Sequence, residues 1–259
     1  MEGGGGWCLH WRPIILGAMA APLVIGHACA AGEAPANTLA GVRACLDAGA
    51  EAMEIDVQLS ADGVPVLMHD ETVDRTTNLA GPLRSFTFAQ LQAANAGDGE
   101  PVPSLDQLMT LVDGRLTVMC ELKQTPGDAE YDQQLVDAVI AVIKAHDANT
   151  WSAVHSFQPA MVERARNTEP RISATIISPP VRGDEVDRLL GALLKRNGQA
   201  LSIEHHCIDR ALMIKAKRRQ VTVWAWTADT EGDWSRLVEA GIDGIITNVP
   251  HRLRAYLGA

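Results

Sequence analysis

Short apolar, β-branched runs alternate with longer helical patterns along this chain, and that alternation restricts its possible folds more than any other feature. Such runs are typical of buried parallel strands joined by crossover helices. Eight candidate strands lie at 22–26, 52–57, 116–122, 152–156, 173–177, 200–204, 221–226 and 244–247. Helical patterns lie at 37–48, 131–145, 159–167, 185–196, 209–219 and 230–240. The strand count and the length of 259 residues predict an α/β fold, a (β/α)8 TIM barrel.

A further apolar run, at 65–69, follows the second strand too closely for a crossover helix. It must return antiparallel, and Asp62-Gly63 is a strong turn signal between the two runs. We therefore expect a β-hairpin that brings His69 back to the level of Asp56. Residues 70–103 carry few periodic signals and much Thr, Asn, Gly and Pro, so we expect a small insertion over the barrel mouth that shapes the pocket.

The N-terminal residues are interpreted separately from the barrel. Gly3 to Gly6 form a glycine tract, and only a modest apolar stretch follows at 13–20. We expect a flexible extension over 1–20 and one barrel domain over 21–259. The extension resembles a poor signal peptide, so a periplasmic location is the alternative to the cytoplasmic one that we predict. The five cysteines are odd in number and form no C-x-x-C pair, which indicates reduced thiols.

The charge balance limits the partners that we expect. With 22 Lys+Arg against 32 Asp+Glu, the formal net charge is −10, which would repel nucleic acid and anionic membranes. No segment after the first twenty residues approaches the roughly 18 continuous apolar residues that cross a bilayer, so we expect no stable membrane insertion. A small phosphate-bearing substrate would need positive charge supplied within its own site. The sequence leaves the oligomeric state open.

Polar side chains stand at the carboxyl ends of the predicted strands, where the active sites of this fold lie. Glu54 and Asp56 are two residues apart in an extended segment, so their side chains leave the same face, and Glu121 and Lys123 share this spacing. Three carboxylates in one barrel mouth would repel each other unless a cation lay among them. A hard ion such as Mg²⁺ or Ca²⁺ is the natural occupant. For Glu54 and Asp56 alone, solvated strand-end carboxylates are an equally good interpretation.

Two of the eight histidines, His27 and His69, are predicted to lie at strand ends that face these carboxylates. Two imidazoles beside a phosphodiester would suit a base that activates the nucleophile and an acid that protonates the leaving oxygen. A divalent ion together with Lys123 would neutralise the charge that builds up at phosphorus. We interpret the remote histidines, such as His146, as structural.

Motifs from about residue 23 to residue 250 resemble those of the glycerophosphodiester phosphodiesterase family. Near the N-terminus, G-H and P-A-N-T at 26–27 and 35–38 look like the family's H-R-G-A and P-E-N-T. The segments E-I-D-V, D-G-V-P-V, H-D, D-R-T-T-N, P-S-L and E-L-K then follow in the family's order, at 54–57, 62–66, 69–70, 74–78, 103–105 and 121–123. Toward the C-terminus, S-F, W-T and G-I-D-G-I-I-T-N at 156–157, 226–227 and 241–248 are similar to its later motifs.

The resemblance implies that Glu54, Asp56 and Glu121 bind one divalent metal ion, with Mn²⁺ as a further candidate beside Mg²⁺ and Ca²⁺. It implies that His27 and His69 form the acid/base pair and that Lys123 contacts phosphate. The reaction it implies is hydrolysis of a glycerophosphodiester to glycerol phosphate and an alcohol, with the glycerol hydroxyl attacking first to form a cyclic phosphate. The alternatives are a lysophospholipase D-like activity on a lipid phosphodiester and a non-catalytic phosphate-ester binding protein.

The chain departs from the family pattern at three positions. Ala28 stands where the family has the arginine after its first histidine, Cys29 replaces a glycine, and Ala36 replaces the glutamate of P-E-N-T. A charge-assisted hydrogen bond to phosphate contributes about 1.5–3 kcal/mol, so the missing arginine implies a different substrate, a compensating cation or impaired catalysis. We favour the first two, because the presumed metal ligands and both histidines are present.

Several other side chains near strand ends are candidates for substrate binding. We expect His155 and His205 to be able to compensate for the arginine and Trp226 to form part of the pocket wall, with barrel packing as the alternative for each. Cys29 beside His27 has two interpretations, a thiolate nucleophile or a small residue in a tight turn, and we favour the second.

Overall fold

The computed structural model describes residues 21–196 and 198–258, so the predicted flexible extension at 1–20 lies outside the described residues. Eight parallel strands form the barrel: β1 (Leu23–Gly26), β2 (Ala52–Leu59), β4 (Thr117–Leu122), β5 (Ser152–Ser156), β6 (Ser173–Ser178), β7 (Ala200–Glu204), β8 (Thr222–Trp226) and β9 (Gly244–Thr247). β1 pairs with both β2 and β9, which closes the sheet. The predicted (β/α)8 barrel is therefore confirmed.

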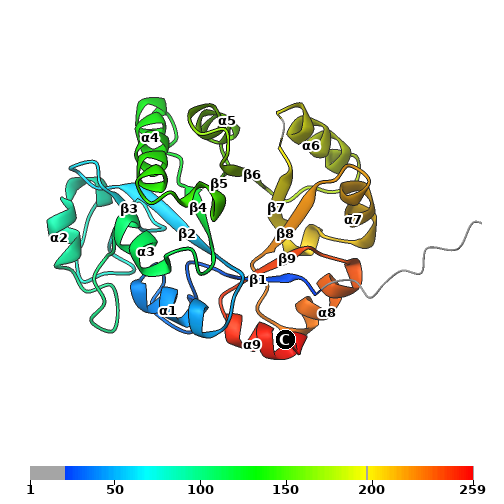
Figure 1. The fold of residues 1–259 in the computed structure, drawn as a ribbon, viewed down its shortest axis with the longest axis horizontal. Coiled ribbons are helices and arrows are strands. Elements are labelled where there is room, and N and C mark those ends of the chain that lie inside the picture. Colours follow the sequence, from blue (N-terminus) through cyan, green and yellow to red (C-terminus); the bar gives the residue numbers. More distant parts are fainter. Residues whose placement is uncertain (1–20, 197, 259) are drawn as a thin grey trace, which may run out of the picture.

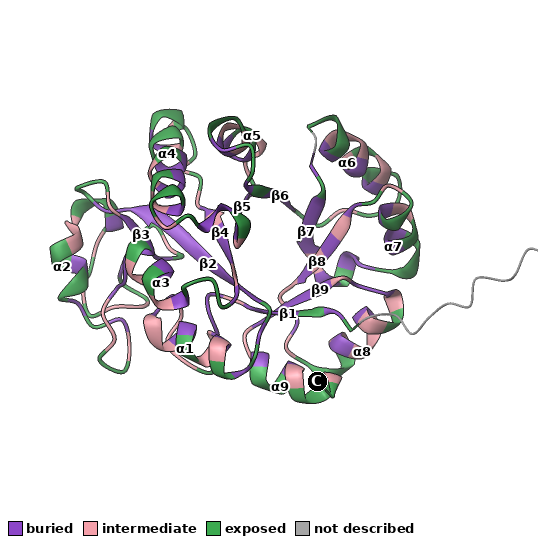
Figure 2. Ribbon diagram, viewed as in Figure 1, coloured by how far each residue is buried: buried purple, intermediate pink, exposed green. Residues whose placement is uncertain are grey.

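Helices surround these strands (Figure 1). They are α1 (Leu39–Asp47), α3 (Leu105–Val112), α4 (Ala129–Ala145), α5 (Pro159–Thr168), α6 (Asp184–Lys195), α7 (Arg210–Lys217), α8 (Glu231–Ala240) and α9 (Pro250–Leu257), with short 3-10 turns η2 (Ala148–Thr150) and η3 (His205–Cys207). The strands are buried while the outward faces of the helices are exposed (Figure 2). This difference explains why the strands are continuous apolar runs and the helices are amphipathic.

The connection after β2 differs from the other crossovers, as the sequence predicted. β3 (Pro65–Leu67) runs back antiparallel along β2, with Val57 opposite Leu67, so the hairpin is confirmed. The next residues contain only the short helices η1 (Leu83–Ser85) and α2 (Phe88–Gln92) before α3 begins. They build an apolar cluster apart from the barrel core, made of Val66, Met68, Val73, Leu83, Leu91, Ala96 and Val102. The insertion is therefore packed by its own side chains and by the hairpin.

Two apolar clusters form the core: a small one inside the barrel and a large one between the strands and the surrounding helices. Ile25, Ala52, Met119, Ala153 and Ile246 pack together within the barrel, with Trp224 and Trp226 against them. The larger cluster joins the outer faces of the strands to the helices. The polar strand ends thus stand above a packed interior that excludes water from below.

The turn after β1 requires a glycine at its first position. A Cβ atom at Gly26 would overlap the carbonyl oxygen of Cys29 and the sulfur of Cys45. We expect Gly26→Ala to lower the free energy of unfolding by about 1–3 kcal/mol or more, because the backbone of the turn would have to move. Gly191→Ala is the matched control, since open space surrounds that position in α6 and alanine is the better helix former. Urea denaturation of both variants checks this prediction, which equal effects would contradict.

Candidate active site

A cavity of about 290 Å³ opens where the barrel strands end, and most of the predicted site residues line it. The predicted residues among its walls are His27, Glu54, His69, Glu121, Lys123, His155 and Trp226. Side chains without a predicted role complete it: Phe157, Ile177, Ser202, Thr227 and Ile246. One side of the cavity is thus ionic and the other is aromatic and aliphatic, as in many small-molecule sites.

The strand register brings the acidic residues together. Asp56 of β2 lies opposite Glu121 of β4, and Glu121 lies opposite His155 of β5. Register partners in a parallel sheet point to the same face, and Glu54 shares the face of Asp56 because it is two residues away. Ligand atoms of Glu54, Glu121 and His155 all lie within 4.8 Å of one another. These three side chains form a group that could hold a metal ion.

Asp56 belongs to the same neighbourhood but has other partners. Its Oδ2 accepts a hydrogen bond from Asn37 Nδ2 at 2.7 Å, and its Oδ1 lies 3.3 Å from Lys123 Nζ. Lys123 Nζ also donates to Glu121 Oε1 at 2.9 Å, so the lysine connects the two carboxylates. Burial lowers the pKa of Lys123, but Asp56 and Glu121 outweigh it and raise that pKa. The lysine is therefore held as a cation at the edge of the carboxylate group.

Glu54 and His155 are the most buried members of the group. Burial alone would raise the pKa of Glu54, but His155, His27 and the N–H of Ala28 bring it down to about 2. His155 is 2% exposed, and within the described part of the chain neither of its ring nitrogens has a hydrogen-bond partner. Its Nε2 lies 3.6 Å from Glu54 Oε1. A buried imidazole without a partner next to an ionised carboxylate fits a cation-binding site.

His27 follows β1 directly and is held by a chain of polar side chains. Its Nδ1 lies 2.7 Å from Asn248 Oδ1, and Asn248 donates to Asp229 Oδ2 at 2.6 Å. Its Nε2 lies 4.0 Å from Glu54 Oε2. Burial lowers the pKa of His27, but Glu54, Asn248 and two further acids together raise it. The ring is thus fixed at Nδ1 and presents Nε2 to the carboxylates.

His69 enters the cavity from the hairpin and the insertion. Its Nδ1 lies 2.7 Å from Asp70 Oδ1, and Arg75 binds both oxygens of Asp70, at 2.6 and 2.9 Å. The Arg75 hydrogen bonds, together with His69, lower the pKa of Asp70 to about 2 against a smaller effect of burial. Asp70 is therefore ionised near neutral pH, and it leaves Nε2 of His69 free to face the cavity.

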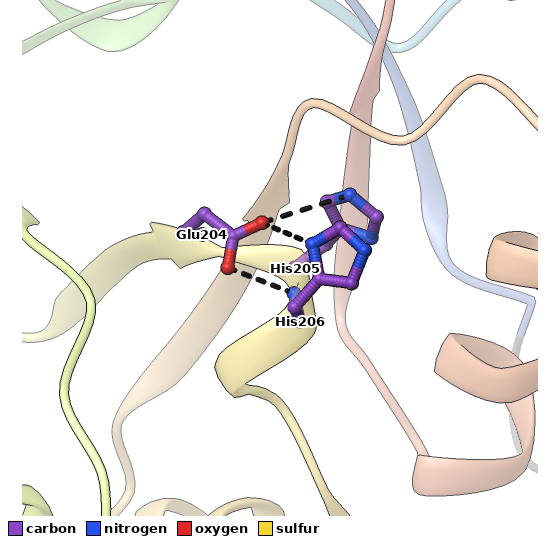
Figure 3. Close-up of side chains that lie close together, drawn as sticks. All are labelled: Glu204, His205 and His206. Carbon is purple, nitrogen blue, oxygen red and sulfur yellow. Dashed lines mark hydrogen bonds and ion pairs between the residues drawn. The ribbon is translucent and has the colours of Figure 1, made fainter.

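The structure places His205 away from this cavity, in contrast to our expectation. Figure 3 shows His205 and His206 beside Glu204 at the end of β7. The chain turns there into η3, because Glu204 caps it by accepting hydrogen bonds from the N–H and Nδ1 of His206 at 3.1 and 2.6 Å. His205 then packs beside Arg236, whose Nη2 lies 3.0 Å from Nδ1 of the ring. It is not among the residues that line the cavity.

Cys29 is part of the packing beneath the site. The residue is fully buried with φ at 69°, and burial raises the pKa of its thiol well above the usual range. A thiol that stays protonated is a poor nucleophile. The structure therefore favours the tight-turn interpretation of Cys29.

Sequence analysis quoted three residues within motifs but gave them no role in supporting the two histidines and Asp56. Asn248 follows β9, Asp70 follows His69, and Asn37 precedes α1. Asn248 and Asp70 stand next to strand ends, which is the signal that could have identified them. Asn37 has φ at 57°, a conformation that no sequence pattern revealed.

Fold and site together define a barrel enzyme whose active site lies at the strand ends and is built from carboxylates, histidines and a lysine. The chain belongs to the glycerophosphoryl diester phosphodiesterase family, whose sequence profile matches residues 27–252. It is thus a phosphoric diester hydrolase of that family. It is 30% identical to a glycerophosphodiester phosphodiesterase of Caldanaerobacter subterraneus subsp. tengcongensis over 239 residues, which cover 89% of this chain and 96% of the relative.

Solved structures agree with this assignment. The chain is similar to a phosphodiesterase of Oleispira antarctica, solved in complex with the product sn-glycerol-3-phosphate, with a TM-score of 0.82 and 25% identity. That likeness covers 92% of this chain and 98% of the other. A glycerophosphodiester phosphodiesterase of Agrobacterium tumefaciens str. C58 shares the fold, with a TM-score of 0.76, 23% identity, and coverage of 90% and 99%.

Proposed function

We propose that the protein hydrolyses a glycerophosphodiester to glycerol phosphate and an alcohol in a metal-dependent reaction with His27 and His69 as the acid/base pair. One observation carries the proposal: both imidazoles line one cavity with a buried group of cation ligands and with Lys123. Each ring has its Nδ1 engaged by a fixed oxygen, which leaves Nε2 for proton transfer.

Glu54, Glu121 and His155 would hold the divalent cation, with Asp56 beside them. When bound, the cation supplies positive charge that stabilises the negative charge developing on the phosphate oxygens. Carboxylates alone would favour Mg²⁺ or Ca²⁺, whereas a ligand nitrogen from His155 would favour Mn²⁺. The orphaned ring of His155 is the reason to include Mn²⁺ in any assay.

The residues of the chain divide the remaining tasks. One histidine takes the proton from the glycerol hydroxyl, whose oxygen attacks phosphorus, and the other protonates the departing alcohol oxygen as its bond to phosphorus breaks. Water then opens the cyclic phosphate, with the same two rings moving the protons. Lys123 places a cation next to the phosphate, and it is the charged donor that this cavity offers in place of an arginine at position 28.

A chelation experiment tests metal dependence. We expect a protein stripped with EDTA and dialysed to lose turnover of glycerophosphocholine, and Mg²⁺, Ca²⁺ or Mn²⁺ added back to restore it, with release of glycerol phosphate as the measurement. Stripped protein to which only buffer is added is the control. Full turnover in the stripped protein would contradict metal dependence. Binding of the diester without turnover in any of the three ions would favour the binding-protein alternative.

The lipid alternative has less support. Phe86 and Phe88, the aromatic residues of the insertion, pack against its own apolar cluster, so they do not form an exposed lipid-docking loop. None of the described helices is long and apolar enough to cross a membrane. The cytoplasmic location remains a prediction.

A further inference from the structure

A second cavity, of about 260 Å³, adjoins the first on the side of β1, β2 and the insertion. His27 and His69 line both cavities, so the two proposed acid/base groups stand between them. A phosphodiester has two ester arms, which leave its tetrahedral phosphorus in different directions. A phosphate placed between the two imidazoles would therefore direct one arm into each cavity.

The second cavity is where two of the departures from the family pattern meet. Ala28 and Ala36, which replace an arginine and a glutamate, both line it. Ala31 and Ala96 complete a wall of small side chains. One replacement removes a positive charge and the other a negative charge, so the cavity gains space while its net charge stays the same.

The charged side chains that face this cavity are already paired. Asp56 is bound by Asn37 and Lys123, and Arg75 binds Asp70 through two hydrogen bonds. The remaining walls are largely apolar, with Leu67, Met68 and Val102 beside the alanines. Arg75 is neutralised by Asp70, so a charged ligand group would gain less from it than from an unpaired cation, whereas an uncharged apolar group against the apolar walls would lose only contact with water.

We propose that this second cavity binds one ester arm of the substrate, and that this arm is uncharged and larger than a methyl group. Ala28 and Ala36, together with Ala31 and Ala96, set the size of the arm. This inference rests on the proposed function, and it names the substrate class: phosphodiesters with one uncharged, ring-sized or branched alkyl arm.

A series of diesters with one constant arm tests the inference. Methyl, isopropyl and phenyl p-nitrophenyl phosphate all release p-nitrophenol, so only the second arm varies. We expect kcat/KM to rise at least about tenfold from methyl to phenyl, because burying an apolar group of phenyl size stabilises the bound state by enough to account for a factor of this size. Calorimetric titration with phenyl phosphate and methyl phosphate measures the same preference as binding, without turnover.

Variants that fill the cavity provide the discriminating comparison. Ala31→Leu and Ala96→Leu are expected to reduce the phenyl-to-methyl ratio of kcat/KM to below about threefold, because their side chains would occupy the space of the larger arm. Ala89→Leu is the matched control, because Ala89 is exposed on α2 of the insertion and lines neither cavity. The ratio is compared between variants, so the intrinsic reactivity of the esters cancels. Two filling variants from different parts of the chain are used, so that if one of them fails to fold, the other still tests the inference.

The possible results separate the two proposals. If the diesters are turned over and neither filling variant changes the phenyl-to-methyl ratio of kcat/KM, the second cavity is not an arm-binding site. The proposed function would still stand. Absence of glycerol phosphate release from glycerophosphocholine in Mg²⁺, Ca²⁺ and Mn²⁺ overturns the proposed function itself, whereas the p-nitrophenyl diesters, which lack the attacking glycerol hydroxyl, test only the second cavity. A larger ratio in wild type and Ala89→Leu than in both filling variants supports the inference.

Discussion

Replacing His69 with alanine is expected to lower kcat by about 10²–10⁴-fold and to change the free energy of unfolding by less than about 0.5 kcal/mol. The side chain is 51% exposed and its partner Asp70 remains bound to Arg75, so little packing depends on the ring. The loss in rate follows from the removal of a proton-transfer group. Steady-state kinetics and urea denaturation measure the two quantities.

His251→Ala is the matched control for this substitution. Its ring is 50% exposed and lies 2.6 Å from a carboxylate oxygen of Glu33, so it resembles His69 in exposure and in partner. It lines neither of the cavities described above. We expect its kcat to remain within about twofold of wild type, as for surface substitutions far from a site. Retention of more than a tenth of kcat by His69→Ala would show that this imidazole is not an acid/base group.

Glu54→Gln is expected to abolish cation binding in the measurable range and to lower kcat/KM by roughly 10³-fold. Glutamine keeps the shape of the side chain and its acceptor oxygen but removes the charge that the cation would neutralise. A bound cation contributes several kcal/mol to transition-state stabilisation, and each 1.36 kcal/mol corresponds to a factor of ten in rate. Isothermal titration with Mn²⁺ and turnover of a diester measure both effects.

Glu204→Gln controls for loss of a carboxylate at a strand end. Glu204 is the last residue of β7, whereas Glu54 is the third residue of β2, and Glu204 too stands beside histidines (Figure 3). Its carboxylate is engaged by His206 and it does not line the active-site cavity. Glu204, His205 and His206 also bring possible cation ligands within 4.8 Å of one another, so this control is judged by turnover, which we expect to be normal. If Glu54→Gln and Glu204→Gln lost turnover equally, the effect would come from the loss of a negative charge in general and not from a site at Glu54.

Sequence periodicity predicted the barrel because its strands are buried on both faces and therefore form continuous apolar runs. The hairpin was predictable for a related reason: the turn at Asp62-Gly63 and the short spacing allowed only an antiparallel return. Three helices, α2, α3 and α9, were missed. They have five, eight and eight residues, and they lie in or beside the loop-rich insertion or near the end of the sequence, where a short helix leaves no clear helical period.

The site was predictable where it depends on strand ends and was not where it depends on turns. Glu54, Glu121 and Lys123 line the predicted cavity because the side chains of parallel strands converge at the barrel mouth. His205 also follows a strand, but the 3-10 turn behind Glu204 carries its ring toward Arg236. His155 was predicted to contact substrate, whereas its buried ring, which has no hydrogen-bond partner and lies 3.6 Å from Glu54, fits a place among the cation ligands.

The separate apolar cluster of the insertion has a consequence for how activity and folding are related. His27 is anchored in the barrel through Asn248, whereas the anchors of His69 belong to a segment with its own small core. Partial opening of that segment would displace one imidazole while the eight strands stay intact. We therefore expect turnover to be lost on heating before the barrel unfolds, so that a spectroscopic melt of the barrel would overstate the temperature range in which the enzyme works.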